Sequence, residues 1–168
     1  IHPVPNTPDA SDVERCGEGE VTMNASGGID QATYRWFESL SGGSSIYTGS
    51  SFKTNVSSTQ SFYVDAVSPQ GCPSPTRTQV VATVNPTPGP PVVFNGARCE
   101  PGQVELSVGG APIGGNYRWY HDQTGGSSFN STNSYTADVT QTTSYWVSII
   151  SAEGCEGSRA EITAIIHT

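Results

Sequence analysis

Helix-forming residues are sparse and scattered in this chain, and no window places apolar residues at positions i, i+3, i+4 and i+7. No apolar run approaches the roughly 18 residues that a transmembrane helix needs. No signal peptide is present either, so we expect any export signal to lie outside this segment. The sequence therefore predicts neither a helical fold nor a membrane span.

Basic residues are also few: 7 Lys and Arg stand against 15 Asp and Glu, which gives a net charge of −8. Nucleic acids and anionic membrane surfaces attract proteins with a basic face, and this chain has none to offer. We therefore expect no nucleic-acid partner and no insertion into a membrane. The acidity is best explained as a source of solubility.

Catalytic motifs are missing as well. The sequence has no G-x-S-x-G, no H-E-x-x-H and no P-loop. Its three histidines are His2, His121 and His167, and the first and last of these occupy the same linker-edge position, where the middle copy has Asn85. With no nucleophile, base and orienting group in view, we predict no catalytic residue, no cofactor and no enzyme activity.

Glycine (19 residues) and proline (12 residues) are abundant instead, and they separate short runs of alternating apolar and polar residues. That pattern is typical of β-strands joined by turns. The sequence also matches itself at an offset of 83 residues. The matching pairs include Cys16 with Cys99, Tyr34-Arg35-Trp36 with Tyr117-Arg118-Trp119, Gly42-Gly43-Ser44-Ser45 with Gly125-Gly126-Ser127-Ser128, Gly71-Cys72 with Gly154-Cys155, and Arg77 with Arg159.

The first residues, Ile1 to Pro5, align with Val84 to Pro88 at the end of the first copy. We therefore expect two repeats from a longer array: the tail of a preceding repeat at 1–7, one domain at 8–86 and a second at 87–168. The proline-rich linker 85–91 favours an extended spacer, and thus an elongated arrangement with few interdomain contacts.

Copy one predicts a weak first strand near 11–16 and further strands at 21–25, 33–38, 45–47, 52–56, 61–67 and 77–84, with the same pattern in copy two. Alternation places one set of side chains in the core. The set is Val21, Met23, Ala25, Tyr34, Trp36, Phe52, Val56, Phe62, Val64, Val80, Ala82 and Val84, with Val104, Leu106, Val108, Tyr117, Trp119, Tyr135, Val139, Tyr145, Val147, Ile162, Ala164 and Ile166 as counterparts. The fold predicted is all-β: two tandem immunoglobulin or fibronectin-III-like sandwiches of about seven strands each.

Each copy contains two cysteines 56 residues apart, which indicates disulfides formed in an oxidising compartment. One hypothesis pairs them within each domain, as Cys16–Cys72 and Cys99–Cys155, because two cysteines per repeat are self-sufficient. However, a simple seven-strand model places the two cysteines of a repeat at opposite ends of the sandwich. The competing hypothesis therefore pairs Cys16 with Cys155 of the next domain.

An acidic cluster near the start of copy one suggests a Ca²⁺ site. Its members are Asp9, Asp12, Glu14, Glu18 and Glu20, and copy two has Val92, Asn95, Ala97, Pro101 and Gln103 at these positions. A structural calcium site in a repeat array should recur, so we predict no metal. A Lys–Asn isopeptide crosslink is disfavoured for the same reason, since Lys53 aligns with Thr136.

Alternation along two neighbouring strands also predicts an outward face with an arginine beside two aromatic rings. Its members are Arg35, Phe37, Tyr63 and Asp65 in copy one, and Arg118, Tyr120, Trp146 and Ser148 in copy two. The arginine and aromatic members are the candidate ligand-binding residues, because exposed rings stack on sugars. The other interpretation is a cross-strand ladder, in which ring pairs and cation–π contacts contribute about 0.5–1 kcal/mol each.

The combination of Thr-Tyr-Arg-Trp-Phe, Gly-Gly-Ser-Ser, Thr-Gln-Ser-Phe-Tyr-Val and Gly-Cys, with its counterpart in copy two, resembles the Ig-like repeats of large secreted and gliding-associated surface proteins of Bacteroidota. The resemblance implies an extracellular or cell-surface location, type IX secretion and a spacer or adhesin role. It implies neighbouring repeats as partners, and surface polysaccharide or another surface protein as further candidates. The two functions in view are a stalk and a carbohydrate- or surface-binding module.

Overall fold

The computed structural model describes residues 3–167, which contain fifteen strands and no helix. The chain forms two compact units, Ile1–Asn85 and Pro86–Thr168. No helix in the described part of the chain is long and apolar enough to cross a membrane. Each unit is a sandwich of two sheets, which confirms the predicted fold class.

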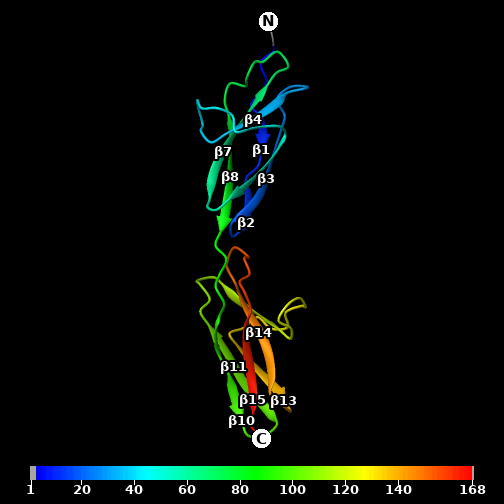
Figure 1. Ribbon diagram of the computed structural model, residues 1–168, viewed down its shortest axis with the longest axis vertical. Helices are drawn as coiled ribbons and strands as arrows, with labels where there is room; N and C mark the ends of the chain where they lie inside the picture. Colours follow the sequence, from blue (N-terminus) through cyan, green and yellow to red (C-terminus); the bar gives the residue numbers. More distant parts are fainter. Residues whose placement is uncertain (1–2, 168) are drawn as a thin grey trace. The chain divides into compact units, whose positions relative to one another are not determined.

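Unit 1 packs a three-stranded sheet against a five-stranded sheet (Figure 1). The first sheet has the order β1 (Asp9–Ala10), β3 (Gly19–Ser26) and β6 (Ser51–Val56). The second has the order β2 (Val13–Cys16), β8 (Thr78–Asn85), β7 (Gln60–Val67), β4 (Thr33–Phe37) and β5 (Tyr47–Thr48).

Unit 2 repeats this plan. One sheet has the order β13 (Ser134–Val139), β11 (Gly102–Gly109) and β9 (Val92–Phe94). The other has the order β10 (Gly96–Arg98), β15 (Ala160–Ile166), β14 (Thr143–Ile150) and β12 (Asn116–Tyr120).

The first strand of each repeat changes sheets partway along, where the sequence predicts one weak strand. β1 pairs with β3 in one sheet, and β2 then pairs in parallel with β8 in the other. Asp12, between the two strands, accepts a hydrogen bond at Oδ1 from the backbone N–H of Val81 at 2.8 Å. Asn95 accepts the same bond from Thr163 at 2.9 Å in unit 2. The crossing point is therefore fixed by a side-chain acceptor that both copies carry.

The cores follow the predicted alternation. All twelve predicted residues of each copy belong to, or pack against, one buried cluster per unit. Trp36 and Trp119 are fully buried, and their indole N–H groups donate to the carbonyl oxygens of Gly49 at 2.9 Å and Thr132 at 2.8 Å. A buried indole without an acceptor would be destabilising, so these bonds complete the core.

In each unit the chain enters at one end and leaves at the other. The incoming segment of unit 1 bonds to the start of β8, through Pro8 O and the hydroxyl of Thr78. β8 then runs through eight residues to Asn85, a span of about 23 Å (Figure 1). In unit 2, β15 runs away from the entry end, and His167 N donates to Arg98 O at the exit end.

Candidate functional site

The outward face of β4 and β7 is built around an ion pair. Arg35 and Asp65 face each other across the two strands. The guanidinium donates Nε to Oδ1 at 3.0 Å and Nη2 to Oδ2 at 2.7 Å, so the pair is bidentate. Asp65 is only 4% exposed. Its carboxylate is thus committed to Arg35 and is not displayed for a ligand.

Phe37, which the sequence analysis places on the exposed face, is 3% exposed, so that expectation is wrong. The reason is Arg77, whose guanidinium carbon lies 3.3 Å from the centre of the Phe37 ring. Arg77 Nη1 also donates to Ser39 O at 2.7 Å and Gly42 O at 2.9 Å. The arginine therefore fastens the loop after β4 and covers the ring at the same time.

Unit 2 has the same arrangement. Tyr120 is 4% exposed rather than open, because the Arg159 guanidinium carbon lies 3.3 Å from its ring centre. Arg159 Nη1 donates to Asp122 O and Gly125 O, both at 2.8 Å.

The repeated Gly-Gly-Ser-Ser motif has its explanation here. Gly42 and Gly43 adopt φ of 67° and 71°, a left-handed turn that side chains disfavour, and Gly125 and Gly126 do the same. Each turn presents a carbonyl oxygen to the covering arginine. The match of Arg77 with Arg159 in the repeat alignment indicates that this arginine has the same role in both copies. Alternation along single strands does not reveal which loop or ring a distant arginine covers.

The ion pair of unit 2 uses a different carboxylate. Ser148 takes the place of Asp65, and Glu156, in the turn after β14, takes over the charge. Glu156 accepts from Arg118 Nη1 at 2.9 Å, from the Tyr120 hydroxyl at 2.6 Å and from the Ser148 hydroxyl at 2.6 Å. The carboxylate therefore comes from a strand in unit 1 and from a turn in unit 2, and in both repeats one negative charge lies beside the arginine.

Burial raises the pKa of Glu156, but hydrogen bonds from Ser148, Tyr120 and Arg118 oppose it, and the pKa ends below its ordinary value of 4.5. These donors favour the charged carboxylate. A group with a depressed folded-state pKa stabilises the fold above its unfolded pKa, and that stability is lost as the pH falls through the folded value.

We expect Glu156→Gln to lower the stability of unit 2 by about 1 kcal/mol at neutral pH and to reduce the loss of stability below about pH 4.5. Thermal unfolding at a series of pH values measures both effects. Glu153→Gln, on an exposed residue of the same turn, is the matched control and should change neither. A variant curve that runs parallel to the wild type down to pH 3 would contradict this role of Glu156.

Two of the candidate aromatics remain partly accessible. Tyr63 lies between Phe37 and Gln79, and Trp146 lies between Tyr120 and Glu161, in the register of their sheets. Both are half-buried, as are Arg35 and Arg118. The face therefore offers one half-buried ring per repeat beside an arginine that is already engaged.

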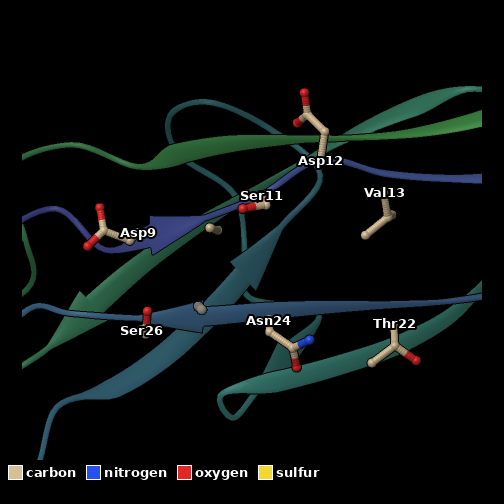
Figure 2. A pocket seen from close by; sticks show the side chains of 9 residues that line it. Asp9, Ser11, Asp12, Val13, Thr22, Asn24 and Ser26 are labelled. Atoms are coloured by element: carbon tan, nitrogen blue, oxygen red, sulfur yellow. The ribbon is translucent and has the colours of Figure 1, made fainter.

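The acidic cluster is spread along the chain rather than gathered. Figure 2 shows Asp9 and Asp12 at separate places beside a hollow that Thr22 and Asn24 also line. Asp12 is occupied by the Val81 amide. In the described part of the chain, no group of three or more His, Cys, Asp or Glu residues is placed to hold a metal ion.

The cysteines of unit 1 lie at opposite ends of the sandwich. Cys16 ends β2 opposite Asn85, at the exit end. Cys72 lies in the turn before β8, where its N–H donates to Ser68 Oγ at 3.0 Å. The length of β8 separates them, about 23 Å, whereas a disulfide requires Cα atoms within about 7 Å.

Unit 2 shows the same separation. Cys99 follows Arg98, which pairs with Ile166 at the exit end, and Cys155 lies in the turn before β15. The intradomain pairs Cys16–Cys72 and Cys99–Cys155 are therefore wrong. Cys72 and Cys99 carry free thiols, so neither pair has formed. The physical reason is the parallel pairing of β2 with β8, and of β10 with β15, which carries the first cysteine to the exit end.

No curated protein matches the chain in sequence. Among solved structures, the chain resembles the fibronectin(III)-like modules of Clostridium thermocellum CbhA, with 13% identity, a TM-score of 0.50 and coverage of 96% of this chain and 93% of that one. It also resembles the FN1–FN3 domains of chicken CNTN1 (13%, 0.53, 98% and 67%) and domains A168–A170 of titin (16%, 0.51, 98% and 67%). At this identity the likeness concerns the fold alone.

The family model described as "Ig-like domain CHU_C associated" matches twice, at residues 5–86 and 88–167. The two matches cover nearly the whole chain, one for each structural unit. The chain therefore belongs to the CHU_C-associated family of Ig-like domains and contains two copies of it in tandem.

Proposed function

We propose that this chain is a non-catalytic spacer in an extracellular bacterial protein. Its two domains would separate a functional module from the point where the protein is attached. The observation that carries the proposal is the path of the chain through each unit. In each unit the chain enters at one end and leaves at the other, as suits a repeat that acts as a spacer. Secretion to the surface of a Bacteroidota cell by a type IX system is the setting we propose.

The state of the outward face supports the same function. Its carboxylates are bonded to its arginines, and Phe37 and Tyr120 lie under Arg77 and Arg159. A binding face holds polar groups ready for a ligand, usually in a concave site. Here each of these polar groups already has a partner within the fold, as expected of a face whose role is to stiffen the sheet.

The second candidate function is a carbohydrate- or surface-binding module. Trp146 favours it, because the ring is half-buried and lies one strand from Arg118. In unit 1, Tyr63 occupies the equivalent place beside Arg35. The two functions make opposite predictions for this ring, since a ladder ring stabilises the sheet and a platform ring binds sugar.

We expect Trp146→Ala to lower the stability of unit 2 by about 1 kcal/mol, seen as a lower melting temperature, because Trp146 stands opposite Tyr120 and Glu161 on the neighbouring strands and cross-strand pairs stabilise a sheet. Trp146→Phe, which keeps a ring, should recover most of that loss. On a glycan array, neither variant should differ from the wild type. A wild-type saccharide interaction that Trp146→Ala abolishes without loss of stability would overturn the spacer function and establish a binding module.

A further inference from the structure

One side of β3 has a strand partner over only part of its length. β6 pairs with β3 along Gly19–Asn24, whereas β1, on the other side, pairs only with Ala25 and Ser26. The chain then crosses to the second sheet, where β2 pairs with β8. A strand edge left in this way carries backbone N–H and C=O groups that can pair with another chain.

The backbone of β3 shows which groups point to this side. Ala25 N donates to Ser50 O at 2.8 Å, on the β6 side. Successive residues of a strand point their backbone groups to opposite sides, so those of Thr22 and Asn24 point away from β6. The N–H and C=O of Thr22 and the N–H of Asn24 have no hydrogen-bond partner within residues 3–167. We call these three groups the open edge.

A hollow lies beside the open edge (Figure 2). Thr22 and Asn24 line one side of it, and the chain from β1 to the start of β2 lines the other. Along β3 the open edge ends at Ala25, where β1 begins to pair, and at Glu20, whose carbonyl oxygen accepts a bond from Arg15 Nη1 at 2.6 Å. The space beside β3 therefore suits a short extended segment.

Unit 2 covers the same edge of β11. Glu105 and Ser107 are the counterparts of Thr22 and Asn24. β9 pairs with Ser107, so it reaches one residue further along its neighbour than β1 does in unit 1. Gly96 lies so close to the carbonyl oxygen of Glu105 that an added Cβ would overlap it. The first strand of unit 2 therefore lies directly over the edge.

Val13, the counterpart of Gly96, explains why unit 1 differs. Its side chain lines the hollow and packs against the edge of the core. The close approach that Gly96 makes to the neighbouring strand leaves no room for a Cβ, so β2 stands apart from Thr22. One residue of the repeat thus decides whether this edge is covered or left accessible.

The hollow is acidic in unit 1. Asp9 and Asp12 line it, and none of the described residues around it is Lys or Arg. Their counterparts in unit 2 are Val92 and Asn95, which carry no charge. Opposite charge across an interface speeds association and selects the partner.

We propose that the open edge of unit 1 binds a short extended segment of another protein that carries a lysine or arginine side chain. The main chain of the segment pairs with Thr22 and Asn24, which extends the three-stranded sheet. Its cationic side chain lies beside the carboxylates of Asp9 and Asp12. Main-chain pairing supplies affinity in this mode of recognition, and side chains supply specificity. This inference goes beyond the spacer function and does not rest on it.

Two capped pentapeptides test the proposal, Thr-Val-Lys-Val-Thr and the same peptide with Glu at its centre. The amide chemical shifts of the intact chain are followed by NMR as each peptide is added. The Lys peptide should shift the amides of Thr22 and Asn24 and leave those of Glu105 and Ser107 in place. Its form with every backbone nitrogen methylated cannot donate to the edge and should cause no shift.

The double variant Asp9→Asn, Asp12→Asn tests the charge. Asn at position 12 keeps the acceptor for Val81 N, because Asn95 makes the equivalent bond in unit 2. With the wild type, the Glu peptide should bind at least about fivefold more weakly than the Lys peptide, a ratio consistent with two exposed ion pairs. The double variant should bind the two peptides equally.

Three results would overturn the proposal. The first is that the Thr22 and Asn24 amides do not move with the Lys peptide, or move no more than those of Glu105 and Ser107. The second is equal binding of the Lys and Glu peptides to the wild type. The third is a shift of the same amides with protein concentration alone, which would show pairing with a second copy of the chain.

Discussion

Arg77→Ala lowers the stability of unit 1 by about 2–3 kcal/mol, the largest single effect that we expect on the outward face. The variant loses the cation–π contact with Phe37 at 3.3 Å, the two bonds to Ser39 and Gly42, and the cover of a ring that is 3% exposed. Cation–π contacts contribute about 0.5–2 kcal/mol and each hydrogen bond about 1 kcal/mol. Partial re-solvation of the loop carbonyls keeps the total below the sum.

Hydrogen exchange of the intact chain in increasing urea, followed by mass spectrometry, assigns the loss to one unit. Peptides of unit 1 should exchange sooner in Arg77→Ala, and peptides of unit 2 should not change. Arg159→Ala should produce the reverse pattern. Arg77→Lys should recover less than half of the stability, because an ammonium does not lie flat on a ring as a guanidinium does. Equal protection of unit 1 in Arg77→Ala and the wild type would refute this role of Arg77.

Asp65→Ser is expected to destabilise unit 1 by about 2 kcal/mol, because it removes the buried acceptor of a bidentate ion pair. Arg35 is 37% exposed in its side chain and stays partly hydrated, which limits the loss. The substitution places in unit 1 the residue that unit 2 carries at this position, Ser148. The variant therefore tests whether the stability of unit 1 depends on a carboxylate at position 65.

Pro73→Glu should restore about half of that loss when it is added to Asp65→Ser. Pro73 is the counterpart of Glu156: each bridges the end of the preceding strand, at Val67 and at Ile150. Pro73 also lines the same hollow as Arg35 and Asp65. Rescue is partial because Phe37 lacks the hydroxyl that Tyr120 donates to Glu156.

Pro73→Glu alone is the matched control, and it should be neutral or slightly destabilising, since Asp65 already satisfies Arg35. Denaturant unfolding of the four proteins forms a double-mutant cycle. A coupling free energy near zero would show that the carboxylate at position 156 is not an exchangeable substitute for the one at position 65.

Much of the fold was predictable from sequence because the sandwich core obeys a local rule. Side chains alternate between two faces, so a residue such as Met23 or Leu106 is assigned to the core by its immediate neighbours. The same rule places Arg35 and Phe37 on the other face, but it does not tell whether a side chain on that face is exposed to solvent. Whether an outward ring is exposed depends on Arg77, which is forty residues away in the chain.

The sequence by itself determined the two repeats, their all-β fold and their cores, since internal matches and alternation are properties of neighbouring residues. Only the tertiary structure decided what happens between strands. It buried Phe37 and Tyr120 under arginines, and it paired the arginine of the outward face with Asp65 in unit 1 but with Glu156 in unit 2. It also carried Cys16 away from Cys72, because the parallel pairing of β2 with β8 is a contact between segments far apart in the chain, which periodicity does not record.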